Sequence, residues 1–529
     1  MKTTITLLIF FIGMASVFAQ DPAILWQNTI GGSASDEVLS ISPTSDGGYI
    51  LGGESLSNIS GDKTEDSNGS WDIWIVKTNE TGALEWEKTI GGNNFDGLGS
   101  ICQTDDGGYL VTADSDSNIS GDKTENSNGS SDYWILKLDA TGTIVWQHTY
   151  GGGNTDYGPK GLQTIDGGYM VVGSSNSGVS GDKTDPSKGE DDIWVLKLDQ
   201  NGAIVWQKTI GGNSFDIFSS IAFANDGGYI INTASSSNIS GNKSENVIGS
   251  DDYWVINLSA EGNVRWDKTL GGTELDFGVD AIATLDGGFL VGGYSNSPIS
   301  GNKSEDPVGD LDYWVVKLDS DGALIWDRTL GRNYDDLLTD IVELEEGSFL
   351  ITGSSEADGT GNRTEPSMGL VDNWFVNLNA LGVITGQKII GGDLSDFPAN
   401  VALRPDGGFV VATTSNSNIA GDKMQASQGA YDYWIYKMDS AFLGLIDIAV
   451  TKTILCYPNP NQGNFKIDLG KTYAKVTFQI TDITGKIIST SKYASVKTVE
   501  MEFDAPAGIY LVDVSLNHGG SKSFKIIKY

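Results

Sequence analysis

The sequence predicts an all-β protein in which a seven-bladed β-propeller, a closed ring of four-stranded sheets, is followed by a small β-sandwich. Three observations predict this fold class. A 60-residue unit recurs seven times at constant length, each unit holds four short apolar segments separated by turn residues, and the series begins with a segment of the fourth type and ends with one of the third. Self-similarity at a fixed period indicates a repeat architecture, and it decides the fold before any single residue is considered.

Columns of identical residues mark the repeated unit. A tryptophan recurs at 60-residue intervals, with an aspartate two residues before each copy: Trp74, Trp134, Trp194, Trp254, Trp314, Trp374 and Trp434. A GGxxxD-type element ends in Asp36, Asp96, Asp156, Asp216, Asp276, Asp336 and Asp396. The aspartate of a DGGY-type turn is replaced only at Glu346, and a second tryptophan column, from Trp26 to Trp326, fails only at Gly386.

The first complete unit shows how the four segments are assigned to strands. They are residues 37–44 (EVLSISPT), 47–55 (GGYILGGES), 72–79 (DIWIVKTN) and 83–90 (ALEWEKTI), with turn residues between them. The third segment is apolar at consecutive positions, so both of its faces are expected to be buried. The fourth alternates between apolar and charged residues, which is typical of an outer edge. Such sheets indicate propeller blades, and a solenoid containing helical turns is the alternative.

The order of the segments favours a closed ring over an open solenoid. Residues 23–30 (AILWQNTI) are a segment of the fourth type, and the last repeat stops after its third segment, residues 432–439 (DYWIYKMD). In a ring, the N-terminal strand supplies the missing outer strand of blade 7. We therefore expect the propeller to occupy residues 20–440.

The N-terminal region has the pattern of a secretory signal peptide. Residues 1–19 contain Lys2, the apolar stretch ITLLIFFIG and a small-residue cleavage pattern at Val17-Phe18-Ala19. An uncleaved membrane anchor is the alternative, but the apolar run is shorter than the roughly 20 residues that span a bilayer. We expect an exported mature chain without a transmembrane segment. Cys102 and Cys456 are too few for a disulfide framework, and we expect free thiols in preference to a bridge between them.

Charge is spread unevenly along the chain. The net charge is −37, residues 20–444 hold 22 Lys and Arg against 63 Asp and Glu, and residues 445–529 hold 10 Lys against 7 acids. The acidity of the larger part disfavours nucleic acid and anionic membranes as partners. The asymmetry argues for two domains, which we place at 20–440 and 456–529 with a linker at 441–455.

The tail has a pattern of its own. Alternating segments such as Val476-Thr477-Phe478-Gln479-Ile480 are typical of a small antiparallel sandwich. The tail also carries, in order, Pro458, Asn459, Pro460 and Gly463, then Asp482 to Lys486 with Gly485, then Ala507 to Val512 with Gly508 and Tyr510, and a lysine-bearing end. Through these residues it resembles the type A C-terminal sorting domain of the Bacteroidetes type IX secretion system.

That resemblance implies that the type IX secretion machinery is a partner. It also implies translocation across the outer membrane, removal of the tail, and either attachment to the cell surface or release. A generic immunoglobulin-like module without an address function is the alternative. The repeats themselves look like the propeller repeats found beside such tails, and no activity follows from that resemblance.

Motifs that carry chemistry are scarce. The chain has two histidines, His148 and His518, which leaves no Ser-His-Asp, Cys-His or zinc-binding pattern. The repeated acids Asp62, Glu65 and Asp72 lack the ligand spacing of an EF-hand loop. We interpret them as turn and cap acceptors, with calcium in the repeated long loops as the alternative. We expect no cofactor.

Carboxylate catalysis is the remaining enzymatic hypothesis, because glycosidases need only two acids at a suitable separation. The first strand of each blade is expected to face the central channel, where one column reads Ser40, Ser100, Lys160, Ser220, Asp280, Asp340 and Asn400. Asp280 and Asp340 fall on neighbouring blades and form the candidate pair of a glycosidase or lyase. The other interpretation is a hydrated polar channel.

The candidate ligand site lies at the seam between blades 7 and 1, on the face that carries the long loops and the GGxxxD turns. Trp71 and Tyr431 occupy the same column in these blades and predict an aromatic platform for sugar rings, with Asp36 and Asp396 accepting hydroxyl hydrogen bonds. The alternative is that both rings cover the blade top. The sequence thus predicts an exported, non-catalytic binding protein for carbohydrate or another extracellular polymer or protein. A glycosidase or lyase and a structural surface protein remain as alternatives.

Overall fold

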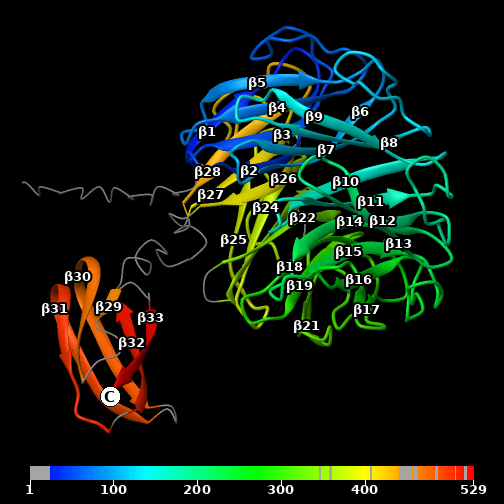
Figure 1. The fold of residues 1–529 in the computed structure, drawn as a ribbon. Coiled ribbons are helices and arrows are strands. Elements are labelled where there is room, and N and C mark those ends of the chain that lie inside the picture. Colours follow the sequence, from blue (N-terminus) through cyan, green and yellow to red (C-terminus); the bar gives the residue numbers. More distant parts are fainter. Residues whose placement is uncertain are drawn as a thin grey trace, which may run out of the picture.

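The computed structural model describes residues 24–344, 347–356, 360–404, 408–439, 455–457, 463–482, 486–506, 508–516 and 521–528. In these ranges the chain forms β-strands and no α-helix. The first 28 strands make seven four-stranded sheets arranged in a ring, and the last five make a sheet of their own (Figure 1). The expectation of an all-β propeller is confirmed.

Six of the sheets each consist of four strands that follow one another in sequence. Blades 1 to 3 contain β2 (Asp36–Pro43), β3 (Tyr49–Ser55), β4 (Asp72–Thr78), β5 (Leu84–Ile90), β6 (Asp96–Gln103), β7 (Tyr109–Ser115), β8 (Asp132–Leu138), β9 (Ile144–Tyr150), β10 (Asp156–Gln163), β11 (Tyr169–Ser175), β12 (Asp192–Leu198) and β13 (Ile204–Ile210). Blades 4 to 6 contain β14 (Asp216–Phe223), β15 (Tyr229–Ser235), β16 (Asp252–Leu258), β17 (Val264–Leu270), β18 (Asp276–Ala283), β19 (Phe289–Ser295), β20 (Asp312–Leu318), β21 (Leu324–Leu330), β22 (Asp336–Glu343), β23 (Phe349–Glu356), β24 (Val371–Leu378) and β25 (Ile384–Ile390).

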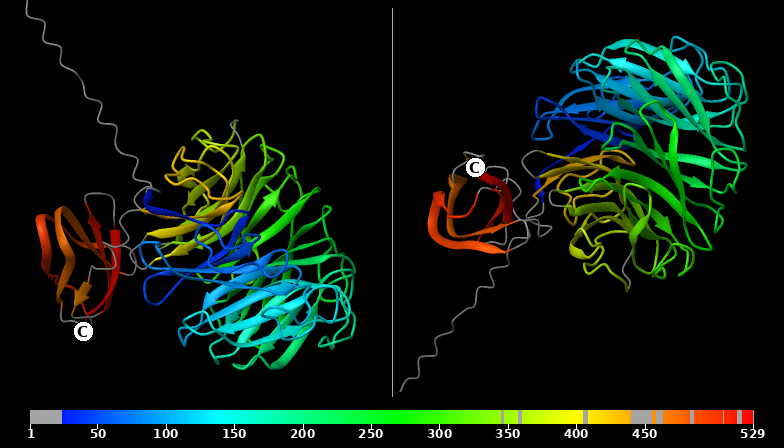
Figure 2. Two further views of the ribbon diagram at one scale, coloured as in Figure 1. Left: turned by 90° about the horizontal axis from the view of Figure 1, so that it is seen from above. Right: turned by 60° about the horizontal axis from the view of Figure 1, so that its bottom comes forward.

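Blade 7 combines both ends of the repeat region. Its inner three strands are β26 (Asp396–Leu403), β27 (Phe409–Ser415) and β28 (Asp432–Met438), and its outer strand is β1 (Ile24–Ile30). Strand β1 pairs antiparallel with β28, from Ile24 opposite Met438 to Ile30 opposite Tyr433. Figure 2 shows the dark blue N-terminal strand beside the yellow and orange strands of this blade. The ring is closed in the way the segment order predicts.

The core lies between neighbouring blades, on both faces of each third strand. Strands β4, β8, β12, β16 and β20 are buried along their whole length, and the repeated tryptophans are fully buried. The Tyr433 ring lies 4.8 Å from the Trp74 ring between centroids, and its hydroxyl donates to the Trp74 carbonyl at 3.0 Å. Tyr133 and Trp194 make the same kind of ring contact between blades 2 and 3, at 5.2 Å. Blade 7 therefore packs against blade 1 through the same kind of Tyr–Trp contact that joins blades 2 and 3.

The repeated loop sequence SGDKTE is explained by a buried lysine. Lys63 is 1% exposed, and its ammonium donates to Ser55 Oγ at 2.8 Å and to Ser67 Oγ at 3.1 Å. It also lies 5.9 Å from the centroid of the Trp74 ring. Burial lowers the pKa of Lys63, although the nearby charges of Asp36 and Asp72 act in the opposite direction. The loop is therefore anchored by a cation that the blade interior holds.

The acids of this loop also have internal partners. Glu65 accepts from Lys88 Nζ at 2.6 Å and from the Thr89 amide at 2.9 Å. The carboxylate of Asp62 accepts from the Gly31 amide at 3.2 Å, and that of Asp72 accepts from the Asn68 amide. These contacts support the interpretation of the repeated acids as turn and cap acceptors.

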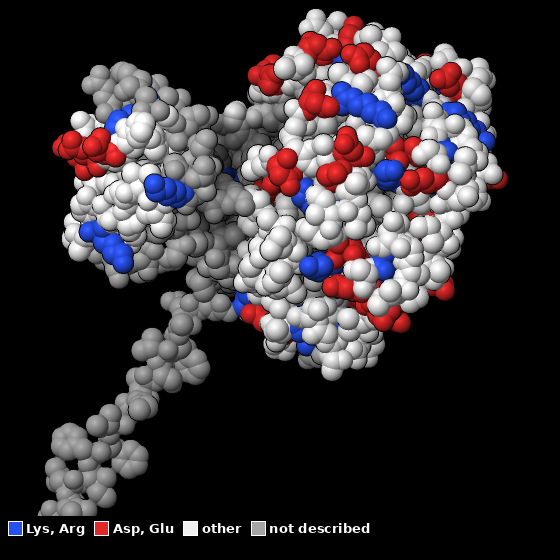
Figure 3. Space-filling model, turned by 90° about the horizontal axis from the view of Figure 1, so that it is seen from below, with Lys and Arg blue, Asp and Glu red and all other residues white. Residues whose placement is uncertain are grey.

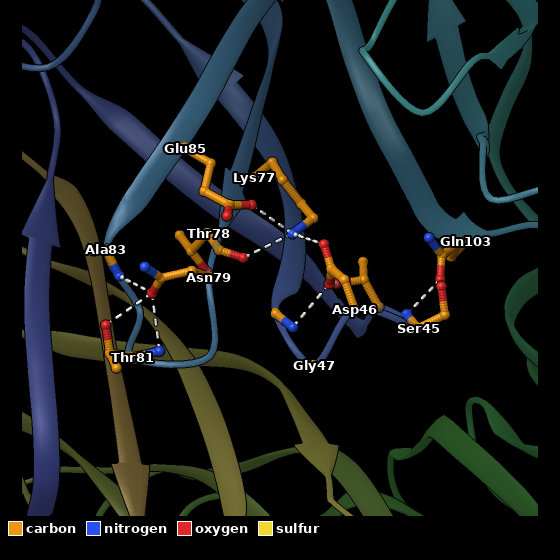
Figure 4. Close-up of polar contacts among 12 residues, drawn as sticks. Ser45, Asp46, Gly47, Lys77, Thr78, Asn79, Thr81, Ala83, Glu85 and Gln103 are labelled. Carbon is orange, nitrogen blue, oxygen red and sulfur yellow. Dashed lines mark hydrogen bonds and ion pairs between the residues drawn. The ribbon is translucent and has the colours of Figure 1, made fainter.

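The DGGY turn is fixed on the opposite face by a second, more exposed lysine cluster (Figure 4). Lys77 contacts Asp46 at 2.9 Å and Glu85 at 2.8 Å, and donates to the Thr78 carbonyl at 2.9 Å. Partial burial acts against ionisation of Asp46, but hydrogen bonds from Thr44 and Lys77 lower its pKa to about 2. The same lysine–aspartate contact recurs as Lys137–Asp106, Lys197–Asp166 and Lys317–Asp286.

The second tryptophan column packs each blade against the next one at the rim. A Cβ atom built on Gly82 would lie 2.3 Å from the Trp26 ring, and one built on Gly382 would lie 2.9 Å from the Trp326 ring. Each of these glycines is in the turn between the third and fourth strands of the following blade. Blade 7 has no such turn, because its fourth strand is β1. The position in blade 6 that would face this turn is Gly386, which accounts for the single gap in the column.

The C-terminal sheet wraps around a core of its own. It consists of β29 (Leu455–Tyr457), β30 (Asn464–Asp482), β31 (Ile487–Glu502), β32 (Gly508–Leu516) and β33 (Ser521–Lys528), in the order β29-β30-β32-β33 with β31 on β30. The pairing of β30 with β31 is interrupted between Asp468 and Tyr473. Residues on both sides of this irregularity, such as Phe465 and Phe478, share one buried cluster. The long strands therefore fold over to enclose the core.

Candidate binding site at the channel mouth

A β-bulge recurs in the innermost strand of every blade. In β2 the register with β3 shifts between Val38 and Ser40, and the equivalent shift occurs in β6, β10, β14, β18, β22 and β26. A bulge places an extra residue on one strand and re-aims its side chain. The residues at or beside the bulges include Leu39, Val279, Thr339 and Ala399, all of which line the cavity described next.

A cavity of about 450 Å³ opens at the end of the channel where the innermost strands begin. This is the face that carries the GGxxxD turns and the long loops, which we call the top face. The cavity, named here the channel-mouth cavity, is lined by Glu37, Val38, Leu39, Lys160, Val279, Thr339, Phe397, Pro398, Ala399, Asn400, Thr414 and Tyr431. Most of these residues belong to blades 7 and 1. The cavity therefore lies at the seam that the sequence indicated.

One wall of the cavity is aromatic. The Phe397 and Tyr431 rings lie 6.4 Å apart between centroids at an interplanar angle of 48°. Phe397 is 40% exposed. The backbone of Tyr431 is held in place because its carbonyl accepts from the Asp36 amide of blade 1 at 2.8 Å. The ring pair is thus positioned by the contact that joins the two blades.

Three polar side chains that line the cavity have unused hydrogen-bonding capacity. Among the described residues, no hydrogen bond or ion pair reaches the Lys160 ammonium, the Asn400 carboxamide or the Glu37 carboxylate. Burial lowers the pKa of Lys160, while the charges of Asp280 and Asp340 act in the opposite direction. Burial raises the pKa of Glu37. Convergent polar groups on an otherwise apolar wall are what small-molecule sites use to orient a ligand.

Asp280 and Asp340 do come together, but neither lines the cavity and they are hydrogen-bonded to each other. The Ile341 amide donates to Asp280 Oδ2 at 3.1 Å and to Asp340 Oδ1 at 3.0 Å, and Asp340 Oδ2 accepts from the Val401 amide at 2.7 Å. Burial, and then the charge of Asp280 to which it is hydrogen-bonded, raise the pKa of Asp340 well above its usual range. The pair therefore links the inner strands of blades 5, 6 and 7.

The same link is made by serines elsewhere in this column. The Ile101 amide donates to Ser40 Oγ at 3.4 Å, and the Gly161 amide donates to Ser100 Oγ at 3.1 Å. A short acceptor at this position thus joins the inner strand to the next one in blades 1, 2, 5 and 6. Lys160 cannot do so, because an ammonium group carries donors and no acceptor.

More acids lie beside Glu37 on blades 1 and 2. Burial, followed by the charges of Asp114 and Glu37, raises the pKa of Glu54 to about 7. Burial raises the pKa of Asp114 to about 6, even though that carboxylate accepts from the Gly158 amide at 3.1 Å. Acidic and basic side chains are interspersed over the propeller face drawn in Figure 3. Burial thus raises the pKa values of all three acids, Glu37, Glu54 and Asp114.

Two of the predicted binding acids are wrongly placed by the sequence argument. Asp36 and Asp396 are fully buried. Asp36 accepts from the Gly32 amide at 2.6 Å and from Ser57 Oγ at 2.9 Å, and Asp396 makes the equivalent contacts with Gly392 and Ser417. These carboxylates hold the GGxxxD turns together and do not face a ligand.

Of the two aromatic residues predicted to form a platform, only one lies at the cavity. Tyr431 lines the cavity, whereas Trp71 does not, and the ring beside Tyr431 is Phe397. The carbonyl of Trp71 accepts from the Asp96 amide of blade 2, which places this residue one blade further round the ring. Sequence reasoning missed Phe397. The available signal was its column, which reads Glu37, Gly97, Tyr157, Ile217, Phe277, Leu337 and Phe397 and so departs from a repeated scaffold.

Cys102 has a free thiol that is partly buried, and burial raises the pKa of this thiol to about 11. Its Sγ lies 3.9 Å from the Gly161 carbonyl of the next blade. In the part of the chain that the structure describes, no group of three or more His, Cys, Asp or Glu side chains is arranged to hold a metal ion. The same part contains no helix with the length and apolar character needed to cross a membrane.

In the tail, several of the predicted sorting residues meet at one corner. Gly463 has φ = +102°, and a Cβ there would lie 2.8 Å from both Lys528 Nζ and the Phe503 carbonyl. Lys528 donates to that carbonyl at 3.1 Å, and the Tyr510 ring packs against Phe503 at 4.9 Å between centroids. In β32, Gly508 pairs with Lys528, and Tyr510 pairs with Asp482 of β30. Pro458, Asn459, Pro460 and Gly485 lie outside the described residues.

Comparison with known proteins identifies the tail. Residues 455–529 match the family model described as the secretion system C-terminal sorting domain. The chain is therefore a β-propeller protein that carries the sorting domain of type IX secretion. This domain addresses the protein to the type IX machinery and hence to the cell surface or the medium.

The chain also has more distant similarities. It is similar to "Regulatory protein FlaEY" of Caulobacter vibrioides, with 27% identity over 210 residues, and the match spans 37% of this chain and 22% of that protein. The fold is similar to the WD40 domain of Neurospora crassa Pan2, with a TM-score of 0.42 and 10% identity over 79% of this chain and 96% of that one. It is also similar to a protein of unknown function from Dyadobacter fermentans, with a TM-score of 0.41 and 11% identity over 79% of this chain and 98% of that one.

Proposed function

We propose that this protein is an exported, non-catalytic binding propeller and that its ligand, a carbohydrate, occupies the channel-mouth cavity. One observation carries the proposal. The cavity combines the Phe397–Tyr431 wall with three polar side chains, Lys160, Asn400 and Glu37, that have no internal partners. Sugar rings offer a C–H face that stacks on aromatic rings and hydroxyl groups that exchange hydrogen bonds with amides and carboxylates. A signal peptide at residues 1–19, removed during export, is part of the same proposal.

The size of the cavity favours the end of a glycan over the middle of a chain. A volume of about 450 Å³ is in the lower part of the range of small-molecule sites. The cavity opens on the top face at the channel axis, so a ligand enters end-on. The propeller thus suits recognition of a terminal sugar on an extracellular polymer or a glycosylated surface protein.

Binding is tested with a glycan array probed with the exported protein, followed by titration of any ligand found. The double substitution Phe397→Ala and Tyr431→Ala should lower affinity more than tenfold, which corresponds to about 1.4 kcal/mol. Trp71→Ala is the matched aromatic control, because Trp71 lies outside the cavity, and it should leave affinity unchanged. A loss confined to Trp71→Ala would place the site on the loops instead of the channel mouth.

A glycosidase or lyase that uses Asp280 and Asp340 is the catalytic alternative. It is less well supported, because the two acids of a glycosidase flank the scissile bond at about 5–9.5 Å, and this pair is hydrogen-bonded together and does not line the cavity. Incubation with the array ligands and a search for new reducing or unsaturated ends tests it, with Asp340→Asn as the control. Activity abolished by that substitution would replace the binding proposal. An array without any ligand would favour a structural surface role.

A further inference from the structure

Lys160 is the exception in the column that links the inner strands. The other six positions hold short side chains, namely Ser40, Ser100, Ser220, Asp280, Asp340 and Asn400. Four of these accept a hydrogen bond from the amide of the next inner strand. A lysine gives up this link and instead extends a cation into the cavity. Because Lys160 does not make the link that the repeated scaffold uses at this position, its side chain is available to bind a ligand.

The Lys160 ammonium lacks a direct counter-ion. No carboxylate oxygen lies within 4.0 Å of it among the described residues, in contrast to the lysines of the DGGY turns, whose aspartates lie at 2.9–3.0 Å. Asp280 and Asp340 act on it only through space, since neither makes an ion pair with it. A partly buried ammonium in a cavity wall gains most from a ligand that brings an anionic oxygen into contact with it.

The groups around Lys160 restrict what kind of anion the site can take. Glu37 lines the same cavity, and the propeller as a whole is strongly acidic. One cation among these acids suits a single negative charge and repels densely charged polymers. Asn400 offers two further N–H donors to the same cavity, while Phe397 and Tyr431 supply the surface for a ring.

We propose that the channel-mouth cavity recognises the terminal acidic sugar of a glycan, whose carboxylate is bound by Lys160 and Asn400 while its ring lies on Phe397 and Tyr431. This inference rests on the proposed function, since it names the ligand class of the same site. Glu37 accepts hydroxyl hydrogen bonds of the same sugar. The specificity for an acid then comes from one residue, Lys160, that is unique in its column.

The test compares matched ligands on the unmodified protein. Oligosaccharides that end in a uronic acid should bind at least tenfold more tightly than the same oligosaccharides ending in the neutral sugar or in the uronate methyl ester. Because the methyl ester keeps the shape of the acid and removes its charge, this comparison needs no variant. The affinities of ligands that end in a sulfated sugar and of ligands that end in an amino sugar are measured in the same way.

Lys160→Met removes the charge at nearly constant length, and Lys160→Arg keeps it. The first should abolish the preference for the acid and leave binding of the neutral ligand unchanged, and the second should retain at least part of the preference. Lys188→Met, at a lysine outside the cavity whose ammonium donates to the Thr209 carbonyl, is the control and should leave the binding of all ligands unchanged. Unchanged melting temperatures establish that the variants are folded.

The other outcomes separate the two proposals. Equal binding of acid, ester and neutral ligands overturns the acid specificity and leaves the carbohydrate proposal standing. A preference for the sulfated ligand overturns the carboxylate assignment, and a preference for the amino sugar assigns the site to Glu37 instead. Failure of every glycan to bind overturns both proposals.

Discussion

The indole nitrogen of Trp434 donates a hydrogen bond to Gln27 Oε1 at 3.1 Å, across 407 residues of sequence. In the other blades the equivalent bond is local, as between Trp74 and Glu87 or between Trp134 and Gln147, which are 13 residues apart. Gln27 also accepts from the Met424 amide at 2.9 Å and donates to the Asp422 carbonyl at 2.8 Å. One side chain of the N-terminal strand thus serves three partners in blade 7.

Removal of the closing strand should destabilise the whole ring. Deletion of residues 21–31 leaves β28 as an unpaired edge, and we expect a large fall in melting temperature or aggregation. Gln27→Ala should cost about 1–3 kcal/mol of unfolding free energy, because the buried Trp434 N–H loses its acceptor. Gln147→Ala in blade 2 is the matched control and should cost a similar amount. Chemical denaturation measures all three, and a deletion variant that melts within a degree or two of the parent would refute closure by β1.

The buried loop lysines should be required as hydrogen-bond donors. In blade 2, Lys123 donates to Ser115 Oγ at 2.7 Å and to Ser127 Oγ at 2.9 Å. Lys123→Met should cost about 1–3 kcal/mol, because both serine oxygens lose their donor. Lys123→Arg should cost less, since Arg363 makes the corresponding contacts with Ser355 and Ser367 in blade 6. Equal losses for the two variants would show that only the length of the side chain matters.

Stability should be lowest near neutral pH. Burial raises the pKa of the repeated aspartates before the third strand to about 6, as for Asp72, Asp132, Asp252, Asp372 and Asp432. Because the folded-state value exceeds the unfolded one, their contribution is full below about pH 4 and is lost as pH rises through 6. Burial lowers the pKa of Lys123, Lys183, Lys243 and Lys423 to about 8, below the unfolded value, so stability increases again between about pH 8 and 10.5.

Tryptophan fluorescence during thermal unfolding follows this dependence directly. The melting temperature should be higher at pH 4.5 and at pH 9.5 than at pH 7. Below about pH 3.8 the exposed turn acids Asp46, Asp106 and Asp166, whose pKa values are lowered to about 2, begin to lose their contribution. A maximum at pH 7 would contradict the pKa shifts on which the prediction rests.

Export should depend on the tail. Truncation at about residue 445 removes the sorting domain and should abolish delivery to the cell surface and the medium, with folded propeller accumulating in the periplasm. Cell fractionation and immunoblotting measure the distribution, and the full-length chain is the control. Normal surface or medium levels of the truncated protein would show that the tail is dispensable for export.

Calcium removal should have no effect on stability. The repeated acids Asp62, Glu65 and Asp72 already accept hydrogen bonds from backbone amides. An ion that binds only the folded state would add roughly 2.7 kcal/mol at a hundredfold excess over its Kd. The melting temperature with chelator and with added calcium should therefore coincide, and a shift of many degrees would assign the long loops to calcium instead.

The fold could be predicted because each blade repeats the same local signals. The apolar run from Ile73 to Val76 and the segment order at the two ends were sufficient to place the strands and to close the ring. Even the departure at Gly386 has a physical cause that follows from ring closure, once the packing of Trp326 on Gly382 is seen. Strand assignment depends on periodicity, and periodicity is visible in one sequence.

The site was predicted less well, because it depends on which side chains a bulge turns inward. Asp36 looked like an exposed acid beside a glycine turn, but the serines that bury it come from a strand and a loop about 20 residues away. Phe397 and Lys160 belong to columns with different residues in each blade, and nothing in the sequence states that blades 3 and 7 face one cavity. The closure of the ring does bring blades 7 and 1 together, and a cavity lies between them.

The pairing of β1 with β28 also sets a time order on folding. Strand β1 is synthesised first, and its partner β28 follows some 400 residues later. Strand β1 therefore stays unpaired while the six blades made of consecutive strands can already form from local contacts. The last blade is sealed only when residue 438 has been made, immediately before the sorting domain. A chain that lacks either β1 or β28 therefore cannot complete the fourth-strand pairing of blade 7, and its ring stays open.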